Sequence, residues 1–384
     1  MSSTEAPRVV VLGGGIGGQV AATRLKQRLG DGARVTLIER SERFVFAPSL
    51  LWVMVGGRKP EAITRGYGVF AKRGIEVVHA TVVRIDTANF EVETSNGKLA
   101  YDYLVVALGA PLDAGRVPGL AEHTHHPYEP AAAERLREAL AAFRGGRVTV
   151  AIASLPYKCP AAPYETAMLI DGFLRKRGIR AQSTIDLYTP EPLPMPVAGP
   201  ETGYRVAAEL ASRGITFHPR SRLDAAEPGS LQVDGQAVAH DLAVVIPPHR
   251  PPEAVAASGL GGPGGWIAVD RSTLRARPSN VYAIGDNVAI PLENGMMLPK
   301  AGVFAHGEAE VVAENIARRI RGDLKETAFD GHGTCFLETG GGKAGLARGD
   351  FYASPAPDVA MQRPGRTWHA AKVAFEQYWL RRWL

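Results

Sequence analysis

The sequence predicts an α/β protein with two dinucleotide-binding domains and a C-terminal amphipathic helical tail. Short apolar strands alternate with helical segments at residues 8–40 and again at 147–188. A glycine motif follows the first strand directly, and residues 367–384 combine aromatic with basic side chains. At 384 residues the chain is also too long for one ordinary core, which favours more than one domain.

The first Rossmann-like unit begins with residues 9–12, an apolar run suited to a strand buried on both faces. Gly13, Gly15 and Gly18 then fit the pattern G-x-G-x-x-G. Gly13 permits the tight turn, Gly15 lets the backbone approach a pyrophosphate, and Gly18 lets the helix pack closely. The helix N-terminus that follows offers unpaired N–H groups to the phosphates.

An acid completes this first unit. Residues 35–38 are predicted to form the second strand, and Glu39 lies at its carboxyl end. A carboxylate at this position suits the ribose hydroxyls of a dinucleotide and would repel a 2′-phosphate. A glycine loop without a nucleotide is the alternative, but the flanking strands, helix and acid disfavour it.

Two later segments indicate which dinucleotide is bound. Residues 101–111 read as an apolar strand and a turn of small residues that includes Gly109, and residues 280–291 read as another strand followed by Gly285 and Asp286. Together with the N-terminal motif they resemble the glutathione-reductase-like flavoprotein superfamily over nearly the whole chain. The resemblance implies FAD, with Asp286 binding its ribityl chain. A Gly-Asp pair taken alone is more often a simple turn.

Residues 298–317 follow directly and are predicted to form a long helix opened by Pro299 and small residues. The resemblance implies that the N-terminus of this helix points at the pyrimidine edge of the flavin. A positive dipole end there stabilises an anionic reduced flavin, and Lys300 could add to that charge. His306 is interpreted as a packed helix histidine rather than a catalytic one.

The second unit keeps the fold pattern but not the nucleotide loop. It comprises a strand at 147–153, a helix at 166–177 and a strand at 181–188. The loop at 154–165 contains three prolines and no glycine. Prolines remove N–H donors and block the close approach that a pyrophosphate needs. This loop therefore argues against NADH as the electron donor.

The chain contains only two cysteines, Cys159 and Cys335, which excludes a disulfide-rich scaffold. Two unrelated buried thiols are the simplest alternative. The segments at 158–165 (KCPAAPYE) and 331–342 (GHGTCFLETGGG) resemble the sulfide:quinone oxidoreductase and flavocytochrome c sulfide dehydrogenase families. The resemblance implies that both cysteines face the flavin and form a redox-active disulfide, which hydrosulfide attacks by thiol–disulfide exchange.

Charged neighbours of Cys159 are the next candidates. Lys158 is adjacent in sequence and would lower the pKa of the thiol if its side chain pointed toward it. Glu165 matches the acid of the families named above, which implies a catalytic role as a proton shuttle. An acid stabilised by the dipole of the helix's first turn is the equally weighted alternative.

Many quinone reductases of this family carry a third cysteine, and this chain has none in the corresponding segment, 122–129. That difference puts the step that carries polysulfide in doubt. His123, His125 and His126 lie there instead. Because no acid cluster or cysteine accompanies them, we expect a surface loop and no metal site.

The tail at 367–384 resembles the C-terminal helix of sulfide:quinone oxidoreductases, which lies in the membrane surface beside the quinone channel. Lys372 and Arg382 fall on the aromatic side, where they could snorkel to lipid headgroups. A core-docking or dimer helix is the alternative. On a helix, one side gathers Trp368, Ala371, Phe375, Tyr378 and Trp379.

These features predict an enzyme whose partners are sulfide, quinone and the membrane surface, held peripherally on the cytoplasmic side. No apolar run of membrane-spanning length and no signal segment is apparent. The net charge of +5 is far from a nucleic-acid signature, and a homo-oligomer remains open. Sulfide:cytochrome c oxidoreductase, NADH:quinone reductase and a non-catalytic flavin or persulfide sensor are the alternatives.

The predicted domain order follows from these segments. The FAD domain comprises residues 1–110 and 267–320, with the second Rossmann-like domain, which carries Cys159, inserted at 111–266. Residues 321–384 carry Cys335 and the tail.

Overall fold

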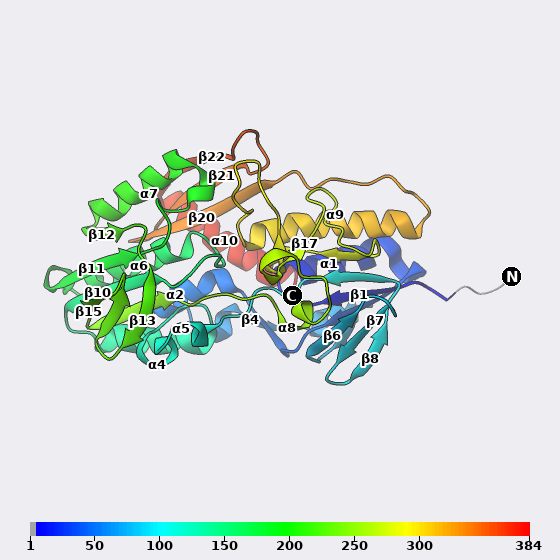
Figure 1. Cartoon of the computed structure of the whole chain (residues 1–384), viewed down its shortest axis with the longest axis horizontal. Coiled ribbons are helices and arrows are strands. Elements are labelled where there is room, and N and C mark those ends of the chain that lie inside the picture. Colours follow the sequence, from blue (N-terminus) through cyan, green and yellow to red (C-terminus); the bar gives the residue numbers. More distant parts are fainter. Residues whose placement is uncertain (1–4) are drawn as a thin grey trace.

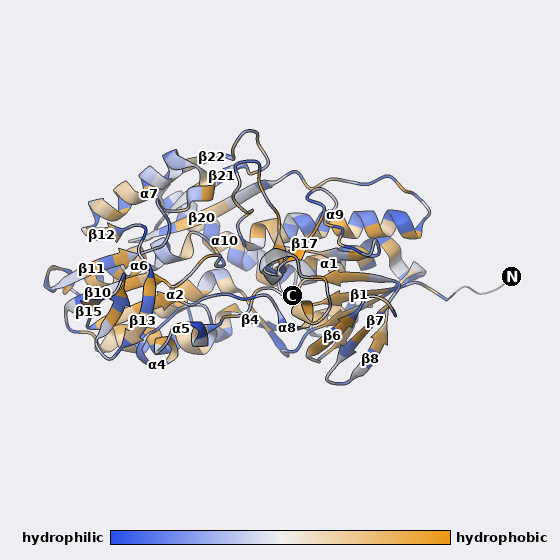
Figure 2. Cartoon of the chain, viewed as in Figure 1, coloured by the Kyte–Doolittle hydropathy of each residue, from blue (hydrophilic) through white to orange (hydrophobic). Residues whose placement is uncertain are grey.

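The computed structural model describes residues 5–384, and Figure 1 shows two lobes with the C-terminal helix between them. One lobe is built on a five-stranded parallel sheet, in the order β18-β9-β1-β2-β5. Apolar residues fill these strands because helices and loops cover both faces of the sheet, as the orange strands in Figure 2 illustrate. The strands are β1 (Arg8–Leu12), β2 (Arg34–Ile38), β5 (Glu76–Val78), β9 (Tyr103–Val106) and β18 (Val281–Ala283).

The other lobe repeats this design with a four-stranded parallel sheet, in the order β12-β11-β10-β16. The central strand β10 leads into the proline-containing loop and then into helix α6. The predicted α/β class with two Rossmann-type sheets and a C-terminal helix is thus confirmed. The elements are β10 (Gly146–Ile152), α5 (Pro130–Ala142), α6 (Ala162–Lys176), β11 (Ser183–Tyr188), α7 (Pro200–Ser212), β12 (Ile215–His218) and β16 (Leu242–Ile246).

A third, antiparallel sheet joins the lobes to the tail. It has the order β20-β21-β22 and carries helix α10 along it. A close approach fixes β20 against α6, because a Cβ added to Gly340 would lie 2.8 Å from the carbonyl oxygen of Met168. The elements are β20 (His332–Gly340), β21 (Lys343–Asp350), β22 (Asp358–Gly365) and α10 (Arg366–Arg382).

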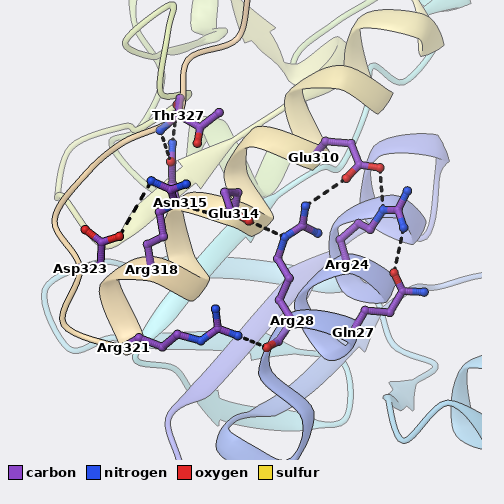
Figure 3. Close-up of polar contacts among 10 residues, drawn as sticks. All are labelled: Arg24, Gln27, Arg28, Glu310, Glu314, Asn315, Arg318, Arg321, Asp323 and Thr327. Atoms are coloured by element: carbon purple, nitrogen blue, oxygen red, sulfur yellow. Dashed lines mark hydrogen bonds and ion pairs between the residues drawn. The ribbon is translucent and has the colours of Figure 1, made fainter.

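Ion pairs between α1 (Ile16–Leu29) and α9 (Gly302–Ile320) tie together segments that lie almost 300 residues apart. Figure 3 shows Arg24 paired with Glu310 at 2.6 Å and Arg28 paired with Glu314 at 2.7 Å. In Figure 2, α9 alternates apolar and polar residues, as expected for a helix with one buried face. These ion pairs hold α1 and α9 side by side, with the N-termini of both helices at the same end of the first sheet.

The remaining elements are short and complete the two lobes. Two small antiparallel sheets, β6-β7-β8 and β13-β14-β15, lie one in each lobe, and strand pairs β3-β4 and β17-β19 add to the first. Their bounds are β3 (Arg43–Val45), β4 (Thr64–Gly66), β6 (Val82–Asp86), β7 (Glu91–Thr94), β8 (Gly97–Ala100), β13 (Leu223–Glu227), β14 (Ser230–Val233), β15 (Gln236–Ala239), β17 (Ile267–Ala268) and β19 (Val288–Ala289), with helices α2 (Leu50–Met54), α3 (Gly68–Lys72), α4 (Leu120–His123) and α8 (Glu253–Ala256).

Two predicted helix boundaries were wrong. Helix α6 begins at Ala162, four residues earlier than predicted, because Pro163 occupies the first turn, where its missing N–H costs nothing. Helix α9 begins at Gly302 instead of residue 298, because residues 298–301 run extended beside the loop that carries Cys159.

The predicted aromatic face of α10 is also corrected. Trp379 and Trp383 are each only 1% exposed and pack into the first core, whereas Phe375 and Tyr378 remain 40% and 56% exposed. Helix α10 therefore packs on the protein through Trp379 and Trp383, and Phe375 and Tyr378 form a smaller aromatic surface that is exposed to solvent. Within residues 5–384, no helix combines the length and hydropathy required to cross a bilayer.

Candidate active site

The carboxyl ends of several parallel strands meet between the two lobes, where open α/β sheets bind their ligands. The loop after β10 reaches the loop before α9, since the Cys159 N–H donates to the Lys300 carbonyl at 2.8 Å. The loop after β9 pairs with the loop after β16 through Leu112 and His249. Segments from both lobes thus border one crevice.

The glycine motif has the geometry predicted for it. Gly13 adopts a φ of +95°, and a Cβ there would lie 2.4 Å from the Ala107 carbonyl oxygen. A Cβ on Gly18 would lie only 1.8 Å from the Gly13 carbonyl oxygen, so α1 packs closely on the loop. Around Gly15, by contrast, a Cβ would meet no atom within 4 Å among the described residues. The backbone therefore leaves open space at the N-terminus of α1, which suits a phosphate.

Glu39 lies beside this space. Its carboxylate accepts hydrogen bonds from the Gly14 N–H at 2.6 Å and from the Ser41 N–H at 2.8 Å. These bonds fix the carboxylate next to the glycine loop, where ribose hydroxyls would reach it.

A second polar cradle surrounds the Gly285–Asp286 turn. Lys300 Nζ donates to the carbonyl oxygens of Asp286 at 2.7 Å and Val288 at 2.9 Å, so this lysine holds the turn itself. Glu308, which the sequence reasoning missed, accepts the Gly285 N–H at 2.6 Å. Burial raises the pKa of Glu308 to about 7 and lowers that of Lys300 to about 8.

Asp286 is desolvated in the same cradle. Burial raises the pKa of its carboxyl, and the ammonium groups of Lys158 and Lys300 oppose that rise. A small cavity beside the turn is lined by Gly285, Lys300 and Phe304 among others, next to the N-terminus of α9. The Gly285–Asp286 turn and the cavity would suit the polar chain of a cofactor. The positive N-terminus of α9 would suit an electron-rich ring edge.

The two cysteines come together in this crevice although 176 positions separate them. Glu165 and Lys372 act electrostatically on both thiols, Cys335 also acts on Cys159, and both cysteines are free in this structure. Burial, followed by the charge of Glu165, raises the pKa of Cys335 to about 11 and raises the pKa of Cys159 still further. Lys372 opposes the rise at both thiols. The disulfide between them stays a prediction.

The cation near the thiols is therefore Lys372 and not Lys158. The pKa of Lys158 is lowered by burial, and the charges that act on it are those of Asp286, Glu129 and Arg40. The charge of Lys158 therefore acts on Asp286 in the polar cradle of the Gly285–Asp286 turn. Sequence adjacency to Cys159 was a poor guide, because Cys159 has a φ of +56° and the backbone turns sharply there.

Lys372 forms a buried ion pair with Glu165. Its Nζ lies 2.9 Å from Glu165 Oε1, and the same oxygen accepts the Glu338 N–H at 2.8 Å. Burial acts to lower the pKa of Lys372, but Glu165 and Glu338 outweigh it and the pKa is raised. Glu165 is therefore more than an acid in the first turn of a helix, because it joins α6, β20 and α10 beside both thiols.

We expect Lys372→Met to destabilise the protein by about 3–5 kcal/mol, because it leaves the Glu165 carboxylate buried without its counter-charge. The free energy of unfolding in urea would measure this loss. Lys26→Met is the matched control: Lys26 pairs at 3.0 Å with Asp31, which is fully exposed, so its loss should cost about 0–1 kcal/mol. Equal losses in the two variants would contradict the prediction.

An apolar cavity adjoins Cys335 on another side. Its walls include Pro160, Met195, Phe304 and Phe351, and Glu191 is among its few polar residues. The sequence reasoning missed Glu191, which is 4% exposed and accepts hydrogen bonds from the hydroxyls of two aromatic residues. Burial raises its pKa to about 7, and the donors are Tyr157 and Tyr164.

The three histidines in residues 122–129 differ in exposure. His123 is exposed, whereas His125 and His126 are half-buried, and burial lowers the pKa of both. No group of three or more His, Cys, Asp or Glu residues with metal-binding geometry occurs in the described part of the chain.

Comparisons with known proteins agree with this geometry. The family model described as pyridine nucleotide-disulphide oxidoreductase matches residues 7–305. The chain is 28% identical to the sulfide-quinone reductase of Aquifex aeolicus, with 98% of this chain and 90% of that protein covered. It is 26% identical to the mitochondrial sulfide:quinone oxidoreductase of Mus musculus, with 90% and 79% covered.

The solved structures give the same result. The crystal structure of the sulfide:quinone oxidoreductase from Aquifex aeolicus superposes with a TM-score of 0.90 at 27% identity, covering 98% of this chain and 91% of that one. A match of this extent includes both sheets and the C-terminal region.

Proposed function

Because the chain belongs to the pyridine nucleotide-disulphide oxidoreductase family, we propose that it oxidises sulfide to sulfane sulfur and passes the electrons through FAD to a membrane quinone. The observation that carries this proposal is that Cys159 and Cys335 share the buried ion pair of Glu165 and Lys372 as their charged neighbours. The named relatives act on sulfide and quinone, which supports the same substrates here.

Membership of this family implies a flavin cofactor, and FAD is the form that fits the residues. The open space over Gly15 and the free N–H groups of α1 would hold the pyrophosphate, with Glu39 at the ribose. The Gly109 loop, Gly285 and the desolvated Asp286 would hold the ribityl chain. When bound, a flavin would accept two electrons from sulfur and pass them on to the quinone.

NADH is disfavoured as the donor because side chains fill the corresponding place in the second lobe. Tyr157 and Tyr164 hydrogen-bond to Glu191, the acid that follows β11. That acid is therefore engaged by protein groups where a nucleotide ribose would need it.

The thiol chemistry follows from the buried site. Hydrosulfide attacks one sulfur of the oxidised cysteine pair, an S–S bond breaks, and one cysteine becomes a persulfide while the other leaves as a thiolate. Lys372 stabilises that thiolate electrostatically, and Glu165 holds Lys372 in place. The apolar cavity beside Cys335 suits an uncharged chain of sulfane sulfur as it grows.

The proposal of a membrane quinone as electron acceptor is supported by the exposed surface of α10. Phe375 and Tyr378 are exposed next to Arg381 and Arg382, a combination that favours an anionic membrane surface. Phe375 also contacts Phe46 and Phe336, and Phe336 follows Cys335. A lipid-dissolved quinone could thus approach the site from this surface, on the cytoplasmic side.

We expect the double change Phe375→Ser and Tyr378→Ser to weaken binding to anionic phospholipid vesicles by about tenfold, since two rings no longer enter the interface. Vesicle co-sedimentation would measure it. Tyr204→Ser, which removes a 63% exposed ring from α7, is the control and should leave binding unchanged. Equal binding by the wild type and the double variant would show that this surface does not meet the membrane.

The experiment that tests the function is anaerobic reduction of the purified flavoprotein. Sulfide should bleach the flavin absorbance, and a short-chain quinone should restore it, whereas NADH should have no effect. Reoxidation by cytochrome c but not by quinone would favour the sulfide:cytochrome c alternative. Bleaching by NADH alone would overturn the proposal.

A further inference from the structure

The buried acid Glu191 binds residues at both ends of the loop that carries Cys159. Its carboxylate oxygen Oε2 accepts the Tyr157 hydroxyl at 3.0 Å and also the Tyr164 hydroxyl. Tyr157 lies two positions before Cys159, and Tyr164 lies five positions after it, in the first turn of α6. Thr189, which follows β11, donates to the same oxygen at 3.3 Å. One side chain therefore connects both ends of the loop to the end of β11.

Hydroxyl groups satisfy this carboxylate in place of a cation. Glu191 is 4% exposed, and burial is the largest influence on its pKa. The hydrogen bonds from Tyr164, Tyr157 and Thr189 oppose that influence, and no basic group of the described chain is among the causes of the shift. A buried acid without a counter-charge depends on its hydrogen-bond donors. The donors are held equally firmly, because hydrogen bonds to a charged acceptor are the stronger ones.

Cys159 needs such support more than Cys335 does. Cys335 lies within strand β20, opposite Ala347 of β21, so a sheet fixes its backbone. Cys159 lies outside any helix or strand, and its φ of +56° falls in the left-handed region that residues other than glycine rarely occupy. A conformation of this kind persists only where the surrounding structure imposes it.

The position of the loop backbone matters for the cysteine pair. Two cysteines can form a disulfide only when their Cα atoms lie about 4.4–6.8 Å apart, so a shift of a few ångströms would separate them. The Cys159 N–H and carbonyl are held by Lys300 at 2.8 Å and by Ala162 at 2.9 Å. The Tyr157 hydroxyl also lies 3.3 Å from the carbonyl oxygen of Pro160, the residue after Cys159.

We propose that Glu191 is a positioning residue for Cys159, which acts through Tyr157 and Tyr164 to hold the loop where the two cysteines can meet. An acid that follows the second strand of a nucleotide-binding unit would bind a ribose. Here the same acid holds the loop that replaces the nucleotide site. This proposal rests on the proposed function, because pairing of the cysteines is part of that function.

Hydrogen exchange followed by mass spectrometry tests this role without sulfide. The holoenzyme is kept in dithiothreitol, so that both cysteines are thiols. We expect Glu191→Leu to speed amide exchange in residues 157–165 by at least about tenfold, because it leaves buried hydroxyls unpaired and the loop opens more often. Exchange in residues 331–342, which carry Cys335, should stay as in the wild type. Glu191→Gln should keep exchange slow, because its amide oxygen still accepts from the tyrosines.

Two tyrosine variants support this test. Tyr157→Phe removes one donor and keeps the ring, so it should give a smaller increase in the same segment, and it decides the question if Glu191→Leu does not fold. Tyr282→Phe is the matched control. Tyr282 is 0% exposed, and its hydroxyl has no hydrogen-bond partner among the described residues, so exchange in residues 157–165 should not change.

The role also predicts slower chemistry. Sulfide should reduce the flavin of Glu191→Leu at least about tenfold more slowly than that of the wild type, because the cysteine is misplaced. Glu191→Gln should restore the wild-type rate. Unchanged exchange in residues 157–165, an equal increase in residues 331–342, or an unchanged rate despite faster exchange would each overturn the role. Failure of the proposed function looks different: sulfide would then reduce no variant, the wild type included, while the exchange measurements would still decide whether Glu191 holds the loop.

Discussion

Replacing Cys159 by serine should lower the rate of sulfide-driven flavin reduction by at least about 1,000-fold, the scale seen when a nucleophilic group is removed. Serine has nearly the same shape and can adopt the same backbone conformation, but it forms no disulfide for hydrosulfide to attack. The flavin should stay bound, because Cys159 contacts the Lys300 carbonyl through its main chain and not through its sulfur. Anaerobic stopped-flow absorbance measures the rate.

Cys335→Ser should have an effect of the same size, since either change leaves a single thiol. The double variant should be no slower than either single one, because residues that act as a unit are not additive. Dithionite, which needs no thiol, should bleach all variants equally and shows that the flavin is intact. If sulfide reduced the flavin of Cys159→Ser at the wild-type rate, the cysteine mechanism would be refuted and the protein would be a generic flavin carrier.

The second large effect concerns two glycines of one motif that should fail in different ways. Gly15→Ala should fold normally, since its φ of −70° suits alanine and its Cβ would meet no described atom within 4 Å. A methyl group there enters the space we assign to the pyrophosphate. A clash of about 1–3 kcal/mol corresponds to a flavin affinity lower by roughly 10- to 100-fold.

Gly18→Ala should instead destabilise the protein itself, because its Cβ would lie 1.8 Å from the Gly13 carbonyl oxygen. Overpacking of this kind costs about 1–3 kcal/mol or more. Thermal unfolding of the flavin-free proteins separates the two cases: Gly15→Ala should match the wild type and Gly18→Ala should unfold earlier. Normal flavin content in Gly15→Ala would mean that the space over this residue is not the phosphate site.

The local part of this protein was predictable from its sequence. Six strands of the two parallel sheets, β1, β2, β9, β18, β10 and β11, lie where short apolar runs predicted them. Strands β5, β12 and β16 were not predicted. The roles of Gly13 and Gly18 likewise depend on contacts a few residues away or on the adjacent strand. The missing glycines in the second loop needed no structure to argue against NADH.

Helix boundaries were less predictable where tertiary contacts decide them. Residues 298–301 have the composition of a helix start, but they pair with the Cys159 loop instead. In α10, the sequence pattern gathers Trp379 with Phe375 on one side. Packing against Phe46 and the first core buries the tryptophan and leaves the phenylalanine outside.

By itself, then, the sequence determined the two-unit α/β fold, the position of the glycine loop and the identity of the two thiols. Only the tertiary structure decided which charges surround them. Lys372 lies 207 positions from Glu165, and His369 lies 31 positions from Glu338, so neither pair has a local signal. The physical reason is that a buried charge needs a counter-charge nearby in space, and the fold brings α6, β20 and α10 together regardless of their order in the chain.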